Sequence, residues 1–548
     1  MESDISLVKM ELDAKPDTEL VKLLGSYHNI FLRQYKVQDN ILSIETKLPH
    51  VWREAAPIIN KVSTGELSYE DGKKLLLDSV IKGQIGTMSM ITVLEAAHKL
   101  GYQTNQVFFE DGIDEKEDGS PSTWNIYHRV GVGRQSGIVV YAGSSNDSII
   151  AKQIQRDKII SNRLVSQLNL KIASWEEIKS EQHLEKIFDE YKKPVVIKPS
   201  GLTQGSGVTT NIYNIDQAKK AYVHAMEMIN IKQRQAWQKG VVIQEQVKGM
   251  DHRLLVVDNK FEIATIRVPA FVIGDGKSSI KQLIEETNKD PRRDMQNPAH
   301  ILKPIKFDEQ LDNFLSEQKL TLDYVPTRKE KVFVRKVASM SQGGITEDVT
   351  DKVHPQIRYL CESIASCIHA NVVGIDIICQ DISKPLTEDN GSFIEMNTRP
   401  EIYLNSFPVI GKQYPDIGEK IIKGLLKDKK PVKKIVVVGY ELSQINQYLN
   451  NIGAFTKDDR VGVLSDGIIY INNEPVSERI KDMSTAIRSI KLNVSLSHIV
   501  LHFKDLQQVR RYGFGFDSFD LLLWGGQDET IQQYERSGLI GIIEKLRK

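Results

Sequence analysis

Apolar positions recur along this chain with two periods, and together they predict a mixed architecture of helices and strands. Residues 88–101 have the apolar spacing of a helix that ends at Gly101, and an apolar strand follows to residue 109. Residues 145–169, SNDSIIAKQIQRDKIISNRLVSQLN, have the spacing of a long helix. Because such helices and strands alternate to about residue 425, we expect a multidomain α/β chain.

The chain of 548 residues is long enough for three or four domains. Residues 1–85 mix alternating and helical patterns and carry no recognisable chemistry, so their role stays open. We expect an αβ segment over 86–150, a larger domain over 151–426 and a further α/β domain over 435–548. The lysine-rich stretch 427–434, KDKKPVKK, is typical of a linker.

Composition excludes several classes of partner. The chain has 72 basic and 72 acidic residues, so no excess charge directs it to nucleic acid or to a membrane surface. No apolar run approaches the roughly 20 residues that span a bilayer. Cys361, Cys367 and Cys379 lack the spacing of a metal site and are typical of buried thiols in a reducing compartment. We therefore expect a soluble cytoplasmic protein that binds neither nucleic acid nor membrane.

A lysine and several glycines follow one apolar run. In residues 192–210, KKPVVIKPSGLTQGSGVTT, the run ends at Lys198, and Gly201, Gly205 and Gly207 come directly after it. Such a loop can cradle phosphates, or it can be a simple turn between two strands. The spacing matches neither the P-loop nor the dinucleotide fingerprint, so the segment by itself leaves both interpretations open.

A polar segment separates two apolar runs in residues 241–257, VVIQEQVKGMDHRLLVV. Exposed backbone groups between two strands can pair with an adenine edge, and a carboxylate such as Asp251 can hold ribose hydroxyls. An ordinary hairpin that turns near Gly249 is the alternative.

Two apolar strands each carry acidic or amide side chains. Asp376 lies in NVVGIDIICQDI, and Glu395 and Asn397 lie in GSFIEMNTRP, where the two-residue period puts them on one face. Carboxylate and amide oxygens from neighbouring strands suit Mg²⁺. A solvent-facing strand edge is the alternative, but apolar neighbours enclose each acid, and an unpaired buried carboxylate is costly. Arg267 and Arg335 follow strand-like runs and can either cap a surface strand or neutralise phosphate charge.

Several segments carry a resemblance to a known family. In chain order they are RDKIISNRLV, VVIKPSGLTQGSGV, VKGMDHRLLVVDNK, RVPAFVIGDGKSSIKQLIEETNKDPRR, LTLDYVPTRKEKVFVRKVASMSQGGITEDVTDKVHP, VVGIDII and FIEMNTRP. In this order and spacing the chain from about residue 130 to 425 resembles the ATP-grasp ligases, and among them the ATP-grasp half of cyanophycin synthetases.

The resemblance implies an α+β ATP-grasp fold with ATP and Mg²⁺ as cofactors. It implies that Lys158 and Lys198 hold the ATP phosphates beneath a flap that includes Ser200, Gly205, Ser206 and Gly207. It implies an adenine hinge at Gln244, Glu245 and Val247 and a ribose ligand at Asp251. It implies a magnesium set of Asp376, Glu395 and Asn397, with Arg267 and Arg335 steadying an acyl phosphate.

The reaction that the resemblance implies is the formation of an amide bond. A substrate carboxylate attacks the γ-phosphate to give an acyl phosphate and ADP, and an amine then displaces phosphate. Amino acids or short peptides are the implied substrates, and a homo-oligomer is the expected assembly. A catalytically silent ATP-binding or scaffold subunit is the alternative, although a scaffold has no use for a full magnesium set.

The chain departs from the family pattern at several positions. Ser200, Gly201 and Leu202 stand where the flap usually has a residue followed by Asp-Gly, and Ser339 stands where an asparagine is expected. After the metal strand, Asn405 stands in place of a histidine. We therefore expect a substrate that differs from that of cyanophycin synthetases.

The last part of the chain resembles the start of a Mur-ligase-like half. DGIIYINNEPV and GFGFDSFDLLLW carry this resemblance, but no phosphate loop of the GTNGKTTT kind follows the strand at VVVGYELSQIN. A domain without that loop cannot hold ATP in the same way. Residues 435–548 are thus predicted to form a degenerate Mur-like domain that serves packing or oligomer contacts.

Overall fold

The computed structural model divides into two compact units. The first comprises Met1–Tyr141 and Leu425–Lys548, and the second comprises Ala142–Gly424. The described residues are 6–27, 34–46, 49–76, 88–110, 125–168, 172–202, 205–231, 240–293, 302–338, 340–451, 456, 459–516 and 519–525. Within these residues no helix is both long and apolar enough to cross a bilayer. Ser339, Thr203 and Gln204 lie outside them.

The N-terminal part of the first unit is a three-stranded antiparallel sheet with helices around a small core. Its elements are β1 (Ser6–Glu11), α1 (Thr18–Tyr27), β2 (Gln34–Gln38), β3 (Ile41–Thr46), α2 (Pro49–Ser63) and α3 (Tyr69–Leu75). Leu20, Leu42 and Trp52 are fully buried in this core. The part of this segment that the structure describes is therefore a folded layer of helices on a sheet.

The next segment confirms the helix and strand predicted around Gly101. The elements are α5 (Met88–Lys99), β4 (Thr104–Glu110), β5 (Asn125–Val132) and β6 (Gln135–Val140). Gly101 has a φ of +79° and donates its N–H to the carbonyl of His98, so it ends the helix in a left-handed turn. The three strands pair in an antiparallel order.

The C-terminal part of the first unit is a six-stranded, mainly parallel sheet. Its elements are β19 (Lys433–Val438), α15 (Leu442–Asn451), β20 (Val461–Ser465), β21 (Ile468–Ile471), β22 (Glu474–Pro475), α16 (Met483–Leu492), β23 (His498–Phe503), α17 (Leu506–Tyr512) and β24 (Leu521–Trp524). The order is β22-β21-β20-β23-β19-β24, with β20, β23, β19 and β24 parallel. Alternate residues of β19, such as Val436 and Val437, enter separate cores on the two faces of the sheet.

The first strand of this sheet leads into its helix by a very short turn. β19 ends at Val438 and α15 begins at Leu442, so only residues 439–441 connect them. Gly439 adopts a φ of +77° in this turn, and its N–H is bonded to the carbonyl of Phe503. Three residues leave no room for a phosphate-binding loop at this position.

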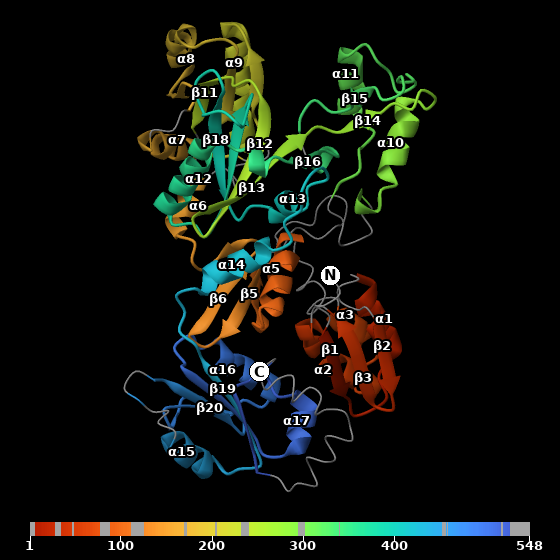
Figure 1. Ribbon diagram of the computed structural model, residues 1–548, viewed down its shortest axis with the longest axis vertical. Coiled ribbons are helices and arrows are strands. Elements are labelled where there is room, and N and C mark those ends of the chain that lie inside the picture. Colours follow the sequence, from red (N-terminus) through yellow and green to blue (C-terminus); the bar gives the residue numbers. More distant parts are fainter. Residues whose placement is uncertain are drawn as a thin grey trace. The chain divides into compact units, whose positions relative to one another are not determined.

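The second unit contains three sheets with separate cores (Figure 1). Its helices are α6 (Ile149–Gln155), α7 (Lys158–Gln167), α8 (Glu181–Ile187), α9 (Ile215–Ile231), α10 (Ile280–Asn288), α11 (Glu309–Glu317), α12 (Pro355–Ile368), α13 (Ile402–Ser406) and α14 (Ile417–Leu426). Its strands are β7 (Gly143–Ser144), β8 (Trp175–Ile178), β9 (Val195–Pro199), β10 (Thr209–Ile212), β11 (Val241–Glu245), β12 (Met250–Val257), β13 (Lys260–Val268), β14 (Phe271–Ile273), β15 (Lys331–Phe333), β16 (Ile345–Asp348), β17 (Val372–Cys379) and β18 (Gly391–Thr398).

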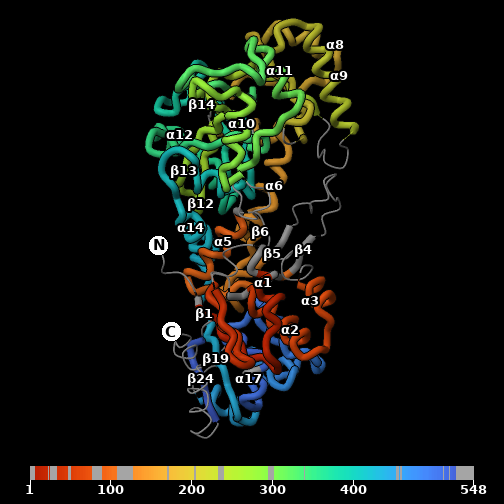
Figure 2. The backbone as a smooth tube through the Cα atoms, turned by 90° about the vertical axis from the view of Figure 1, so that its right-hand side faces the viewer, coloured from red at the N-terminus to blue at the C-terminus, as the bar shows by residue number. Residues whose placement is uncertain are grey.

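Each sheet of the second unit has its own helices. The four-stranded antiparallel sheet β10-β9-β11-β8 packs against α8 and α9, which lie side by side in both views (Figure 1 and Figure 2). The five-stranded antiparallel sheet β16-β13-β12-β17-β18 packs against α6, α7 and α12. The two-stranded sheet β14-β15 packs against α10 and α11.

One prediction about local structure is wrong and one alternative is excluded, and both outcomes matter for the site. The long helix expected over residues 145–169 is broken into α6 and α7, because Asp157 adopts an extended backbone (φ −127°) and caps α7. The hairpin considered for residues 241–257 does not form, since β11 pairs with β8 and β9 whereas β12 pairs with β13 and β17. Residues 246–249 therefore connect two different sheets.

Candidate active site

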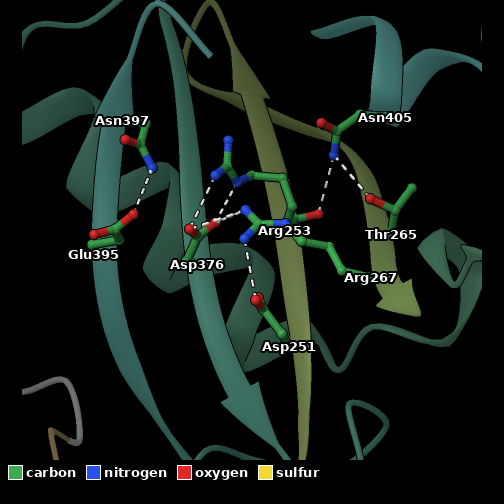
Figure 3. A network of polar contacts seen from close by, with 8 residues as sticks. All are labelled: Asp251, Arg253, Thr265, Arg267, Asp376, Glu395, Asn397 and Asn405. Carbon is green, nitrogen blue, oxygen red and sulfur yellow. Dashed lines mark hydrogen bonds and ion pairs between the residues drawn. The ribbon is translucent and has the colours of Figure 1, made fainter. Parts of the chain in front are cut away.

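The five-stranded sheet has one apolar face and one polar face. Side chains alternate along each strand, so Val373, Ile375 and Ile377 of β17 enter the core beneath the helices, while Asp376 points to the opposite face. The same alternation applies to the neighbouring strands. On the polar face lie Asp251 and Arg253 of β12, Thr265 and Arg267 of β13, Asp376 of β17, and Glu395 and Asn397 of β18 (Figure 3).

A β-bulge in β18 allows both faces to be satisfied. Asp376 is paired with Glu395, but the next pair joins Ile377 to Phe393, so Ile394 is an extra residue in β18. Phe393 can therefore enter the core while Glu395 and Asn397 stay on the polar face. The local period placed these two side chains on one face, and the bulge places Glu395 opposite Asp376, with Asn397 opposite Gly374.

Asp376 is the centre of the charged network on this face. It accepts hydrogen bonds from Arg253, including one of 3.0 Å from Nη2 to Oδ2. Arg267 donates from Nη2 to both oxygens of Asp376 and from Nη1 to Oδ2 of Asp251, at 3.1 Å (Figure 3). The two guanidiniums thus neutralise a carboxylate that is almost completely buried.

The pKa values of the two acids shift in opposite directions. Burial raises the pKa of Asp376. The charges of Arg253 and Arg267 lower it by more than burial raises it, so the pKa is below its ordinary value. Burial raises the pKa of Asp251 to about 6, against the lowering effect of Arg267. Oδ1 of Asp251 is buried and accepts no hydrogen bond. This unsatisfied oxygen can accept a hydrogen bond from a hydroxyl group of a bound ligand.

A second cluster gathers the two predicted phosphate lysines. Lys198 is 6% exposed on β9, and its Nζ donates to Oε1 of Gln244 on β11 at 2.7 Å. Nζ of Lys158 donates to the carbonyl of Leu202 at 2.8 Å and lies 4.0 Å from Oε2 of Glu395. The lysine cluster therefore adjoins the polar face of the five-stranded sheet.

Burial weakens the protonation of both lysines. It lowers the pKa of Lys158, and together with the charge of Lys158 it lowers the pKa of Lys198 to about 8. Two desolvated cations side by side are costly unless an anion joins them. The cluster is thus a suitable place for phosphate groups.

The break between α6 and α7 is what positions Lys158. The side chain of Asp157 accepts from the N–H of Ile159 at 2.9 Å, so Lys158 is the first residue of α7. The backbone N–H of Lys158 is bonded to the carbonyl of Ser200, at 3.1 Å. The helix start is in this way tied to the beginning of the glycine-containing loop.

The glycine-containing loop connects two paired strands. β9 and β10 are antiparallel neighbours, so the loop is a hairpin connection as well as a candidate phosphate flap. Gly205 and Gly207 have φ values of +72° and +71°. A Cβ on Gly207 would meet Pro199 at 2.8 Å, whereas one on Gly205 would meet nothing within 4 Å. The loop is packed at Gly207 and open at Gly205, next to the half-buried Ser206.

The predicted adenine hinge lies at the crossing between two sheets. The N–H of Glu245 is bonded to the carbonyl of Ser174, and the N–H of Gln246 is bonded to the carbonyl of Pro194. The carboxylate of Glu245 accepts from the N–H of Lys192 at 3.0 Å. These bonds fix the backbone just before the half-buried Val247. The side chain of Gln244 accepts its hydrogen bond from Lys198.

Arg335 does not join the other predicted residues. It is 2% exposed, and its guanidinium donates to both oxygens of Asp308, at 2.7 and 2.9 Å, and to the carbonyl of Lys306 at 2.7 Å. Its charge is therefore already paired within the subdomain that contains α11 and β15. Of the two arginines predicted to steady an acyl phosphate, only Arg267 lies on the polar face.

Sequence reasoning missed Arg253 and the use of Asn405. Arg253 lies two residues after Asp251 on β12, so the period that identified Glu395 and Asn397 could also have identified it. Asn405 is buried and donates from Nδ2 to the carbonyl of Arg253 and to Oγ1 of Thr265, both at 3.2 Å (Figure 3). Its role in holding β12 against β13 gives no signal in the sequence.

The donor set on the polar face fits a hard divalent cation in its chemistry. Glu395 is about one-third exposed, and Asn397 donates to it at 3.4 Å, so carboxylate and amide oxygens lie beside the buried Asp376. Among the described residues, no group of three or more histidine, cysteine or acidic side chains could hold a metal. Mg²⁺ would thus require oxygens from a nucleotide to complete its shell.

Residues 156–269 match the family model of the phosphoribosylglycinamide synthetase ATP-grasp (A) domain. This range contains both lysines, the loop, the hinge, Asp251 and Arg267. This part of the chain is similar to an ATP-grasp domain. Its α/β architecture of several sheets agrees with the fold expected from the sequence.

Curated relatives match the chain over about half of its length. Cyanophycin synthetase of Synechocystis sp. is 34% identical over 269 residues, which is 49% of this chain and 30% of the relative. The glutathione biosynthesis bifunctional protein GshAB of Clostridium perfringens is 30% identical over 280 residues, or 51% of this chain and 35% of the relative. The chain thus covers about a third of the length of these relatives.

A solved structure also aligns with the chain. The bifunctional glutathione synthetase from Pasteurella multocida is 24% identical, with a TM-score of 0.48, over 66% of this chain and 46% of that chain.

Proposed function

We propose that this ATP-grasp protein is an ATP-dependent carboxylate–amine ligase that joins amino acids or short peptides through an acyl phosphate, with release of ADP and phosphate. The observation that carries the proposal is the 4.0 Å approach of Lys158 to Glu395, which brings the lysine cluster beside the polar face with Asp376 and Arg267. Phosphate groups and a substrate carboxylate can then meet at one place.

In this proposal each residue of the chain has a distinct task. Lys158 and Lys198 neutralise the ATP phosphates, and Ser200, Gly205, Ser206 and Gly207 belong to the loop that closes over them. Gln244, Glu245 and Val247 border the adenine, and the free Oδ1 of Asp251 accepts from ribose. Asp376, Glu395 and Asn397 would hold Mg²⁺, which supplies charge neutralisation of the transferring phosphoryl group.

Positioning, rather than a protein nucleophile, is the source of catalysis in such a reaction. The substrate carboxylate is itself the nucleophile, and Arg267 provides the fixed positive charge beside the reacting oxygens. Arg335 is left out of this role because Asp308 already pairs with it. Closure of the loop would exclude water, which would otherwise hydrolyse the acyl phosphate.

The C-terminal domain has a supporting role in this proposal. Residues 435–548 are inferred to be a Mur-like domain without its own nucleotide site, because only residues 439–441 connect β19 to α15. Cytoplasmic location and assembly into a homo-oligomer stay predictions from the sequence.

The test is incubation of the purified chain with ATP, Mg²⁺ and pools of amino acids and dipeptides, with ADP release and product mass followed together. ADP and a new condensed mass, both lost in Lys198→Met, are expected. Measurable ATP binding without ADP formation from any pool would instead support a silent ATP-binding or scaffold subunit.

A further inference from the structure

The second unit contains a cavity whose lining includes neither the lysine cluster nor the residues of the polar face. Its volume is about 380 Å³, a size typical of small-molecule sites. Its walls are largely apolar and include Phe271, Leu283, Leu302, Ile345 and Val409. Phe271 belongs to β14, Leu283 to α10 and Ile345 to the start of β16, whereas Leu302 and Val409 lie in connecting segments. None of these five residues is among those proposed to bind ATP.

The cavity adjoins the strands that carry Arg267. In the pairing of β13 with β16, Arg267 is opposite Thr346, and the next pair joins Val268 to the cavity residue Ile345. Ala270, two residues beyond the end of β13, also lines the cavity. Val268 and Ile345 belong to the apolar core of this sheet, so the cavity borders the sheet at the edge strand β16, one residue pair from Arg267 and Thr346.

One buried cation of the cavity lining makes no ion pair with a described carboxylate, although Glu286 and Asp290 also line the cavity. Arg293 is 5% exposed, and its Nη1 donates only to two carbonyls, those of Lys303 at 2.5 Å and Gly343 at 3.0 Å. Its Nε is buried and has no hydrogen-bond partner. Among the residues that the structure describes, no carboxylate lies within ion-pair distance of Arg293. Burial lowers the pKa of Arg293, and the charge of Asp290 opposes this shift only in part.

The other arginines of this region differ from Arg293 in that respect. Arg292 also lines the cavity, but Asp290 neutralises it, with Nη2 and Oδ2 2.7 Å apart. Arg335 is paired with Asp308. Because a buried unpaired charge is costly, an anion that enters the cavity would gain its strongest interaction at Arg293.

We propose that this cavity is the site of the amine substrate, an amino acid with an apolar side chain whose carboxylate binds Arg293. The planar guanidinium suits a carboxylate, and the apolar walls suit a side chain rather than a bare inorganic anion. The inference rests on the ligase function proposed above, because only that reaction needs an amine. The carboxylate of the acyl donor reacts and must reach the ATP phosphate. The carboxylate of the amine substrate does not react, so it can stay bound to Arg293 during the reaction.

The test compares L-leucine with L-leucinamide as probes, since they share the amine and the side chain and differ in the carboxylate. Titration calorimetry on the full-length protein measures both affinities for wild type, Arg293→Gln and the control Lys289→Gln, which changes an exposed cation outside the cavity lining. We expect leucine to bind at least about tenfold more tightly than leucinamide in wild type and in the control, the scale of one charge-assisted hydrogen bond. We expect Arg293→Gln to remove the difference.

A second variant keeps the test valid if Arg293→Gln does not fold. Val409→Phe enlarges a side chain of the cavity lining, leaves Arg293 in the sequence, and should weaken leucine binding at least about tenfold, with ATP affinity unchanged. Equal binding of the two probes in wild type, an unchanged ratio in folded Arg293→Gln, or full leucine affinity in Val409→Phe would each overturn the assignment.

The outcomes separate this inference from the ligase proposal. ADP formation with amino-acid substrates but without discrimination between the probes would overturn the cavity assignment alone. Discrimination that depends on Arg293, without ADP formation from any substrate, would overturn the ligase function and leave an amino-acid-binding site.

Discussion

Arg267 holds Asp376 by two hydrogen bonds from one nitrogen, with Nη2 2.9 Å from Oδ1 and 3.0 Å from Oδ2. Arg253 donates to the same carboxylate from the next strand, so a residue predicted to bind metal is already neutralised by protein cations. The carboxylate of Glu395 has no such arginine partner among the described residues. We therefore expect Glu395 to dominate metal binding, with Asp376 mainly fixing the two arginines.

Glu395→Gln should remove the magnesium dependence of ATP binding and reduce ADP formation at least about 100-fold, because it removes a partly exposed charge from the phosphoryl site. Thermal unfolding should stay within a few degrees of wild type. Calorimetry of ATP with and without Mg²⁺ measures the first effect. Asp389→Asn, at an exposed turn before β18, is the matched control, and a loss of magnesium dependence there would contradict the assignment.

ATP affinity should fall as pH rises through about 8, where Lys198 loses its proton. Its pKa is lowered in the free protein, and phosphate binding needs the charged form, so binding takes up a proton above this pH. The dissociation constant should then rise by up to about tenfold per pH unit. Lys198→Arg, which keeps its charge, should flatten the profile. An unchanged slope in that variant would assign the titration to another group.

The same lysine bears on the stability of the free protein. A folded-state pKa of about 8 lies below the ordinary value for lysine, 10.5. The cost of burying the charge is therefore fully present below pH 8 and disappears as pH rises to the unfolded value. Lys198→Met should consequently be at least as stable as wild type at neutral pH by urea unfolding.

Arg335→Met should lower the free energy of unfolding by about 2 kcal/mol, because it removes three hydrogen bonds, two of them to a carboxylate. Arg293→Met should cost much less, since Arg293 has no counter-ion to leave behind. Urea unfolding of the two variants measures the difference. If Arg335→Met were as stable as wild type but inactive, Arg335 would have the catalytic role that the sequence suggested.

Calorimetry should find one ATP per chain, with all binding lost in Lys198→Met. Every residue expected to contact ATP lies in the second unit, and only residues 439–441 connect β19 to α15 in the C-terminal sheet. A second ATP, or binding that persists in Lys198→Met, would show that the C-terminal domain holds nucleotide after all.

Much of the site could be predicted because its signals are local. The two-residue period of β18 put Glu395 and Asn397 on one face, and the apolar run of β9 ended in Lys198. The apolar spacing predicted one long helix through Asp157, and that prediction is wrong. The side chain of Asp157 caps α7, so a new helix begins there. The local pattern was also insufficient at residues 246–249, because a turn signal does not reveal which sheet the next strand joins.

The sequence by itself determined the type of fold, the order of its elements and the kinds of side chain that each strand presents, since propensity and period act over a few residues. Only the tertiary structure decided the partners. Arg253 meets Asp376 across 123 positions of sequence, Asp308 pairs with Arg335 whereas no described carboxylate pairs with Arg293, and an extra residue at Ile394 sets the register of β18. Pairings of this kind depend on strand register and packing between distant segments, which no local pattern encodes.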